Sequence, residues 1–338
     1  DATTGPKILD FVRGDRYNEK YQSILAGDLT LQFECGMKAP ATGIFRARDG
    51  ILGDILHARP IFVGAPPADY LFDGYPAYKS TNSARAERVY VGANDGMLHA
   101  FDVATGAEVF AYIPSTLTGN LKDLSTDPYA HKYFVDGGSV VGDVNFAASP
   151  ASDWRTVFVG GLGAGGKGLF ALDVTDPDAA TESAAAGKIL WEITASTPGF
   201  ADLGYTYGDP LIVRLNTGQW AAIVGNGYMN SNTGRAVLYV IDISNGALIK
   251  SFDTGSGSLA SPNGLSSPIA VDTNADGKID RVYAGDIDGN MWKFDLSGAT
   301  AGSWVTPTVP LYASGKAITG APDVVAHPLN GYLVYFST

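Results

Sequence analysis

One stretch of nine residues has the composition and spacing of a cation-binding loop. Residues 272–280 read Asp-Thr-Asn-Ala-Asp-Gly-Lys-Ile-Asp, which puts side-chain oxygens at the first, third, fifth and ninth positions and a glycine at the sixth. Ca²⁺ takes about six to eight oxygen ligands, and alternate residues of a tight loop supply them. We therefore predict a calcium site here. The predicted ligands are Asp272, Asn274, Asp276, Lys278 through its backbone carbonyl, and Asp280.

The residues around this loop favour strands over the helices of an EF-hand. Position 12 of the loop, where an EF-hand carries a bidentate Glu, is Tyr283. The flanking segments 268–271 and 281–284 are rich in β-branched and aromatic residues, which is typical of strands. The alternative is an Asp- and Asn-rich turn without a metal. Because three carboxylates in one loop would repel each other, the spacing favours calcium.

Composition excludes several function classes. The chain has 338 residues, a net charge of −12 and no basic cluster, so it is not expected to bind nucleic acid or anionic lipid. No apolar run is long enough for a transmembrane helix. Cys35 is the only cysteine, which rules out an internal disulfide or a Cys-based metal site. The four histidines are scattered without an HExxH pattern, which argues against catalytic zinc.

A repeated pattern of strands and glycine turns runs along the chain. Residues 90–102 recur as residues 283–295, and looser copies span 157–173 and 223–242. A proline precedes most copies and is tolerated at the first residue of a strand. Four strands per unit at this period predict an all-β fold, a β-propeller. We expect residues 1–50 to be an N-terminal extension and residues 51–338 to form the blades. Four blades are complete and a fifth begins near Thr319, so we expect the natural protein to continue beyond Thr338.

Several segments together carry a family resemblance. Residues 11–19 read Phe-Val-Arg-Gly-Asp-Arg-Tyr-Asn-Glu, and residues 93–102 read Ala-Asn-Asp-Gly-Met-Leu-His-Ala-Phe-Asp. Residues 45–60 read Phe-Arg-Ala-Arg-Asp-Gly-Ile-Leu-Gly-Asp-Ile-Leu-His-Ala-Arg-Pro, and residues 159–166 read Val-Gly-Gly-Leu-Gly-Ala-Gly-Gly. With these motifs, nearly the whole chain resembles the C-terminal domain of PilY-type pilus proteins.

The resemblance implies a non-enzymatic factor for type IV pilus biogenesis and cell adhesion at the bacterial surface. It implies a modified, quinoprotein-like propeller with seven blades. It further implies that Ca²⁺ in the loop at 272–280 regulates pilus extension against retraction, and with it twitching motility. Its expected partners are pilins, minor pilins and a host-cell surface receptor. Export would run through the periplasm and the outer membrane.

The alternative function is that of a quinoprotein dehydrogenase. Such propellers hold pyrroloquinoline quinone over a calcium ion, often against a disulfide of adjacent cysteines. A single cysteine excludes that disulfide. The calcium loop is also interpreted as joining two outer strands, rather than gathering ligands from several blades. Fold alone does not carry the activity.

Other short motifs have simpler structural interpretations. Residues 161–168 approach a phosphate-binding glycine loop, but the residues that follow predict a strand and not the helix that such a loop needs. Arg13-Gly14-Asp15 is an integrin-type tripeptide and a candidate receptor-binding site. The alternative is a helix start with Asp15 as N-cap, leading into a short helix at about 16–26. His99 is expected to be a buried hydrogen-bonding residue. Asp286 and Asp288 are interpreted as part of a hairpin turn and not as a second cation site.

Overall fold

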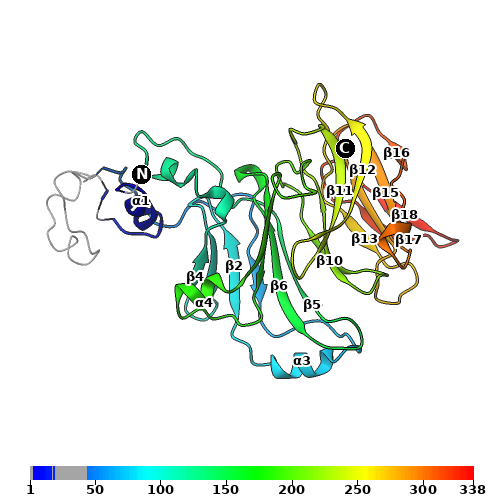
Figure 1. Cartoon of the computed structure of the whole chain (residues 1–338), viewed down its shortest axis with the longest axis horizontal. Coiled ribbons are helices and arrows are strands. Elements are labelled where there is room, and N and C mark those ends of the chain that lie inside the picture. The colour runs from blue at the N-terminus through cyan, green and yellow to red at the C-terminus, as the bar shows by residue number, and fades with distance from the viewer. Residues whose placement is uncertain (1–2, 17, 20–43) are drawn as a thin grey trace.

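The computed structural model describes residues 3–16, 18–19 and 44–338. Its strands form an all-β architecture with a few short helices at the periphery (Figure 1). Cys35 lies outside the described residues, as does most of the helix expected at about 16–26. Of that segment, Arg16, Asn18 and Glu19 are described, and none of the three is helical.

Within the described residues, the strands form four antiparallel sheets of four strands each, followed by a two-stranded hairpin, and the predicted all-β fold is confirmed. In every sheet, consecutive strands are neighbours, so each blade is a simple meander. Blade 1 consists of β1 (Ile61–Val63), β2 (Arg88–Gly92), β3 (Leu98–Asp102) and β4 (Glu108–Tyr112). Blade 2 consists of β5 (Ser139–Asn145), β6 (Trp154–Gly161), β7 (Gly168–Asp173) and β8 (Ile189–Thr194). Blade 3 consists of β9 (Leu211–Arg214), β10 (Trp220–Gly225), β11 (Arg235–Asp242) and β12 (Leu248–Gly257). Blade 4 consists of β13 (Ile269–Val271), β14 (Arg281–Gly285), β15 (Asn290–Asp295) and β16 (Tyr312–Ala313). The hairpin is β17 (Asp323–Ala326) with β18 (Tyr332–Tyr335).

The sequence repeat corresponds to the central hairpin of each blade. In blade 1, Tyr90 pairs with Ala100 across β2 and β3. In blade 4, Tyr283 pairs with Lys293 across β14 and β15, at the equivalent position of the repeat. The turn glycines of these hairpins, Gly96 and Gly289, have φ of 98° and 87°. Glycine adopts such values without the steric cost of a Cβ, which explains its recurrence at this position.

The first strand of each blade lies on the inner side of the arrangement. β1 contacts β5, β5 contacts β9, β9 contacts β13 and β13 contacts β17. The loop at 272–280 joins β13 to β14, the two innermost strands of blade 4. The interpretation that it joins two outer strands was therefore wrong. Hydrophobic periodicity indicates that a segment is a strand, but the radial order of strands depends on contacts between blades.

The hydrophobic core is divided among the interfaces between neighbouring blades. In β6, Phe158 packs in a cluster with blade 1, whereas Val157 and Val159 pack in a cluster with blade 3. In β10, Ala222 packs towards blade 2 and Ile223 towards blade 4. Because successive residues of a strand point to opposite faces, both faces of these blades are buried. A fourth cluster joins blade 4 to the β17–β18 hairpin.

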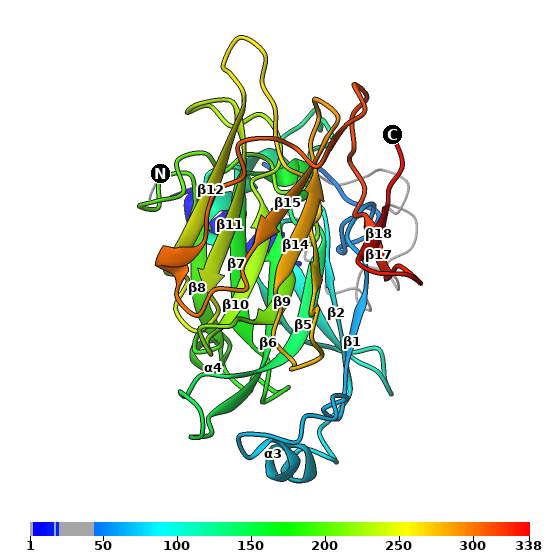
Figure 2. The ribbon, with the colours of Figure 1, turned by 90° about the vertical axis from the view of Figure 1, so that its right-hand side faces the viewer.

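Short helices lie outside the sheets. The helix α1 (Gly5–Val12) packs against the 3₁₀ turn η3 (Leu121–Ser125), and α3 (Tyr75–Thr81) projects at the bottom of both views (Figures 1 and 2). The other helices within the described residues are α4 (Glu182–Ala186), η2 (Ser115–Leu117), η4 (Gly163–Gly165) and η5 (Ala301–Ser303). Among the described residues, none of these helices has the length and apolar character needed to cross a membrane.

Candidate functional site

The predicted calcium loop is organised around the carboxylate of Asp272. One oxygen, Oδ1, accepts backbone N–H groups of Asn274 at 3.1 Å, Ala275 at 2.7 Å and Asp276 at 3.3 Å. The other, Oδ2, accepts the N–H of Gly277 at 2.7 Å. The backbone reaches this geometry through positive φ values of 60° at Ala275 and 78° at Gly277. Asp272 therefore sets the curvature of the loop.

The next two predicted ligands continue the same winding. Asn274 Oδ1 accepts the N–H of Asp276 at 3.0 Å, and Asp276 Oδ1 accepts the N–H of Lys278 at 2.9 Å. The Lys278 ammonium lies 3.3 Å from Asp276 Oδ2. These are successive Asx turns, in which a side chain bonds the backbone two residues ahead. Asn274 and Asp276 are exposed and Asp272 is half-buried, so this part of the loop is open to ions from solvent.

Asp280 has a different environment from the other predicted ligands. It is only 4% exposed, and its Oδ1 accepts the amide of Asn216 at 3.0 Å. Its Oδ2 accepts both the N–H of Thr273, at 2.8 Å, and the Thr273 hydroxyl. Burial alone would raise the pKa of Asp280, but the hydrogen bonds from Thr273 and Asn216 outweigh it and hold the pKa below its usual value.

The structure thus places all five predicted ligands on one loop without gathering their carboxylates around one point. In the described ranges, no group of three or more His, Cys, Asp or Glu side chains is close enough to hold a metal ion. The donor chemistry nevertheless suits a hard cation. Asp272 Oδ2 and Asn274 Oδ1 each accept a single hydrogen bond, as do both oxygens of Asp276. A carbonyl or carboxylate oxygen has two lone pairs, so these oxygens retain acceptor capacity.

Residues outside the motif connect the loop to the neighbouring blade and to the terminal hairpin. Ile279 N–H donates to the carbonyl of Arg214 at 2.9 Å, and Asn216 donates to the carbonyl of Ile279 at 2.9 Å. Tyr332, in β18, donates its hydroxyl to the carbonyl of Thr273 at 3.3 Å. Sequence reasoning missed Asn216 and Tyr332 because these contacts join segments far apart in the chain. No local pattern marks either residue.

The hairpin turn at 286–290 confirms the interpretation of Asp286 as a structural residue. Asp286 is fully buried (0% exposed), and its carboxylate accepts the side chains of Asn263 at 2.9 Å and Trp292 at 2.8 Å. It also accepts the backbone and side-chain N–H groups of Asn290 at 2.8 and 2.9 Å. Asp288 is exposed at the tip of the turn. The two carboxylates therefore have separate surroundings.

Arg13-Gly14-Asp15 ends a helix and does not begin one. The N–H of Gly14 donates to the carbonyl of Phe11, and the N–H of Asp15 donates to that of Asp10. With Gly14 at φ 101°, this is the Schellman arrangement that closes helices. The interpretation of Asp15 as an N-cap was therefore wrong, because the helix precedes the tripeptide. Arg13 pairs with Glu182 of α4, and both side chains are largely exposed. Receptor binding by the tripeptide stays a prediction.

The glycine-rich segment at 161–168 has the expected context. A single 3₁₀ turn, η4, follows Leu162, and strand β7 begins at Gly168. The predicted strand is confirmed, so the segment does not lead into a helix N-terminus of the kind that cradles phosphate. His99 is likewise confirmed as a buried hydrogen-bonding residue, 2% exposed and bonded to two carboxylates.

Four meander blades that bury a core at each mutual interface define a β-propeller domain. The chain belongs to the PilY1 beta-propeller domain family, whose model matches residues 52–338. It is 40% identical over 99% of its length to the type IV pilus biogenesis factor PilY1 of Pseudomonas aeruginosa PAO1. It is 39% identical over its whole length to a PilY1 homologue of Xylella fastidiosa Temecula1. The chain spans 29% and 23% of these two relatives.

A solved structure agrees with this assignment. The crystal structure of the Pseudomonas aeruginosa PilY1 C-terminal domain superimposes with a TM-score of 0.67 at 40% sequence identity. The match covers 81% of this chain and 58% of that domain. The likeness in both sequence and structure confirms the predicted family and fold class.

Proposed function

We propose that this chain is the calcium-binding propeller of a non-enzymatic type IV pilus biogenesis and adhesion factor at the bacterial surface. Calcium in the loop at 272–280 regulates pilus extension against retraction, and hence twitching motility. Pilins and minor pilins are its partners in the pilus. Family membership supports the pilus role, because the relatives are named as pilus biogenesis factors and not as enzymes.

The observation that carries the regulatory part is the attachment of the loop to other parts of the propeller. Its exposed half presents the oxygens of Asp272, Asn274 and Asp276, and its buried half is fixed to blade 3 through Asp280 and Asn216. A cation on the exposed half relieves the repulsion between Asp272 and Asp276. Because both halves belong to one short loop, such a change reaches the contacts with Asn216 and Tyr332.

The expected affinity is that of a switch. The loop has three carboxylates and no bidentate Glu at position 12, which favours dissociation constants of about 10⁻⁷ to 10⁻³ M. A site of this strength fills and empties as calcium in the surroundings changes. Ligand binding at moderate saturation stabilises the bound state by only a few kcal/mol, which suits a reversible signal.

Titration calorimetry on purified variants tests the site. Asp276→Asn keeps the shape and the Asx turn of the residue but removes one charge, so calcium affinity should fall at least about tenfold, since ligand charge tunes such sites. Asp272→Ala removes the acceptor of four backbone N–H groups and should abolish binding. Asp288→Asn, an exposed carboxylate on the same blade, is the matched control. Unchanged affinity in both loop variants would reject the ligand assignment.

The regulatory claim needs a test in cells that carry the full-length protein. Asp276→Asn is preferable to substitution of Asp280, because Asp280 also holds Asn216 and Thr273 and its loss would confuse two effects. At equal protein levels, Asp276→Asn should change surface piliation and twitching in the same direction as calcium depletion of the wild type. Asp288→Asn should behave as wild type. Normal, calcium-responsive twitching in the Asp276→Asn strain would make the ion structural and not regulatory.

A further inference from the structure

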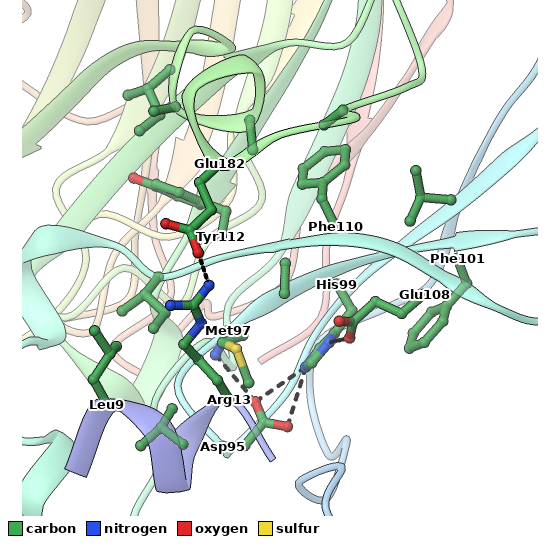
Figure 3. A pocket seen from close by; sticks show the side chains of 18 of the residues that line it. Leu9, Arg13, Asp95, Met97, His99, Phe101, Glu108, Phe110, Tyr112 and Glu182 are labelled. Carbon is green, nitrogen blue, oxygen red and sulfur yellow. Dashed lines mark hydrogen bonds and ion pairs between the residues drawn. The ribbon is translucent and has the colours of Figure 1, made fainter. Parts of the chain in front are cut away.

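A cavity of about 890 Å³ lies between the N-terminal helix and blades 1 and 2. Its walls come from α1, from β3 and β4 of blade 1, and from α4 (Figure 3). The ion pair of Arg13 with Glu182 runs from the end of α1 to α4 across this space. Pockets for small organic ligands commonly have volumes of about 300–1,000 Å³, so the size fits such a ligand.

Much of the cavity lining is apolar. Leu9 and Val12 of α1 form one wall, Met97 and Val109 of blade 1 form another, and Ala185 of α4 faces them. Leu9, which lines the cavity, is 40% exposed. An apolar ligand body placed here would remove such surface from water, which is favourable in proportion to the area covered.

The polar part of the lining centres on His99. Its Nδ1 lies 2.7 Å from Glu108 Oε2, and its Nε2 lies 3.1 Å from Asp95 Oδ2. Burial alone would lower the pKa of His99, but hydrogen bonds and charge from Asp95 and Glu108 outweigh it and raise the pKa to about 9. At neutral pH the imidazole is therefore a cation. Figure 3 shows the His99 ring between the carboxylates of Asp95 and Glu108.

The charges of the lining do not balance. Two cations, Arg13 and His99, line the cavity together with four carboxylates. Those carboxylates are Asp95, Glu108, Glu182 and Glu192. Glu182 is paired with Arg13, and Asp95 and Glu108 share His99. Glu192 accepts from the Tyr112 hydroxyl and from Ser115, which are neutral donors. The cavity thus carries two more negative than positive charges.

Glu108 is the carboxylate best placed to meet a ligand. Its side chain is 49% exposed, and Oε2 is fixed by His99. Within the described residues, Oε1 has no hydrogen-bond partner. Because His99 orients the group, one carboxylate oxygen is presented without further loss of side-chain freedom, and an ordered acceptor binds with a smaller entropic cost.

We propose that this cavity binds a small organic cation, an ammonium or guanidinium group on an apolar body, with Glu108 receiving the cationic group. The excess of carboxylates selects against anions, and the apolar walls select against inorganic cations. The site is separate from the loop at 272–280 and does not depend on calcium.

Three probes with one apolar body test the charge requirement by titration calorimetry at neutral pH. They are phenylbutylamine, phenylbutanol and phenylbutanoate. The protein should bind the protonated amine, and its affinity for the alcohol should be at least about tenfold lower. The reason is that hydrogen bonds between charged groups are stronger than those with a neutral partner. The carboxylate should bind least. Absence of amine binding at millimolar concentration would overturn the proposal, and so would equal affinity for amine and alcohol.

Variants of the same chain place the binding event. Glu108→Gln keeps the side-chain shape but removes the charge, and should lower amine affinity at least about tenfold. Glu87→Gln, an exposed glutamate outside the cavity, is the matched control and should bind as wild type. Ala185→Trp should narrow the cavity and lower the affinity for all three probes, with circular dichroism confirming that the variant is folded. Undiminished amine binding in a folded Glu108→Gln or Ala185→Trp variant would show that the probe binds elsewhere.

Discussion

The carboxylate of Asp286 shows how strongly the surroundings of a side chain constrain it. All four hydrogen bonds to this buried group come from uncharged donors on Asn263, Asn290 and Trp292. An isosteric amide cannot replace it, because Oδ2 accepts three N–H donors and Oδ1 accepts the backbone N–H of Asn290, so the NH₂ group would oppose a donor in either orientation. The aspartate is therefore required for its acceptor capacity and not for metal chemistry.

Asp286→Asn should destabilise blade 4 by about 3 kcal/mol, since buried donors would lose an ionised acceptor. Hydrogen exchange of the β14 and β15 amides measures this locally, because exchange reports the free energy of opening in each segment. Asp288→Asn at the exposed tip of the same turn should change this free energy of opening by less than about 0.5 kcal/mol. Equal protection in the two variants would contradict the structural role of Asp286.

His99 should make stability depend on pH in the alkaline range. Its pKa is raised to about 9 in the folded protein, with Asp95 and Glu108 as the groups that raise it, against about 6.5 in an unfolded chain. The stabilisation is therefore fully present below about pH 6.5 and is lost as pH rises through about 9. At about 1.36 kcal/mol per pKa unit, the loss amounts to roughly 3 kcal/mol.

Urea unfolding of the wild type and of His99→Gln between about pH 6 and pH 10 measures this effect. The free energy of unfolding should fall less across this range in the variant than in the wild type. His327→Gln is the matched control, since His327 lies in the β17–β18 hairpin and its Nδ1 accepts the N–H of Leu329. That variant should keep the wild-type profile. A His99 imidazole that titrates near its ordinary value by NMR would contradict the expectation.

The chemistry of single residues was predictable from sequence only where it is local. The Asx turns from Asp272 to Lys278 follow from residue spacing, because each bond spans a few positions. The bond from Asn216 to Asp280 spans 64 positions, and neither partner signals the other. The position of His99 on a predicted strand made its burial and hydrogen bonding predictable. The approach of α1 and α4 to its cavity was not predictable, because those helices are distant from His99 in the chain.

At the scale of elements, the end of α1 depends on one glycine. Gly14 has φ of 101°, and a Cβ built there would lie 3.1 Å from Ile51 Cγ2. Gly14→Ala should therefore destabilise the docked helix by about 1–2 kcal/mol, the cost of a left-handed residue with a Cβ. Gly5→Ala is a matched control in the same helix, because a Cβ there meets nothing within 4 Å.

Hydrogen exchange of the α1 amides would compare these variants, and Gly5→Ala should be neutral or slightly stabilising. Equal exchange in both would mean that the Schellman closure does not limit the helix. The outcome also bears on the integrin-type tripeptide. Gly14 of the tripeptide already has a structural role, because it ends α1. This role explains the glycine without receptor binding.

Strands were predictable where the repeat supplied several examples of one pattern. The hairpins at 90–102 and 283–295 share turn glycines and equivalent cross-strand pairs, so each copy supports the other. Helix α1 has no such copy, and the local sequence predicted a helix after Asp15 and not before it. The position of the calcium loop between inner strands was also missed, because it follows from how blades pack.

At the scale of the whole molecule, neighbouring blades are coupled in chain order. Each hydrophobic cluster joins consecutive blades, and the first strands contact one another in the same order. In repeat architectures, stability is approximately a sum of unit terms and nearest-neighbour interfaces. A perturbation at one blade should therefore weaken with distance along the series, which limits how far a calcium signal in blade 4 can travel.

Hydrogen exchange with and without calcium should display this limit, if the loop at 272–280 binds the ion as proposed. Protection should increase in β13 and β14, which flank the loop, and less strongly in β9, which is reached through Asn216. The β17–β18 hairpin should respond through Tyr332. Blade 1 shares no cluster with blade 4, so β2 and β3 should not change.

Two variants separate the routes out of the loop. Asn216→Ala removes the donor to Asp280 and to the Ile279 carbonyl but leaves the bond from Ile279 N–H to the Arg214 carbonyl, so calcium should still protect β13 and β14 but should protect β9 less than in the wild type. Tyr332→Phe removes only the hydroxyl that reaches Thr273, and should reduce the response of the β17–β18 hairpin without changing that of β9. Undiminished calcium-dependent protection of β9 in Asn216→Ala would show that the signal passes through the backbone bond of Ile279 to Arg214 and through strand packing, and the side-chain route from the loop would then be wrong.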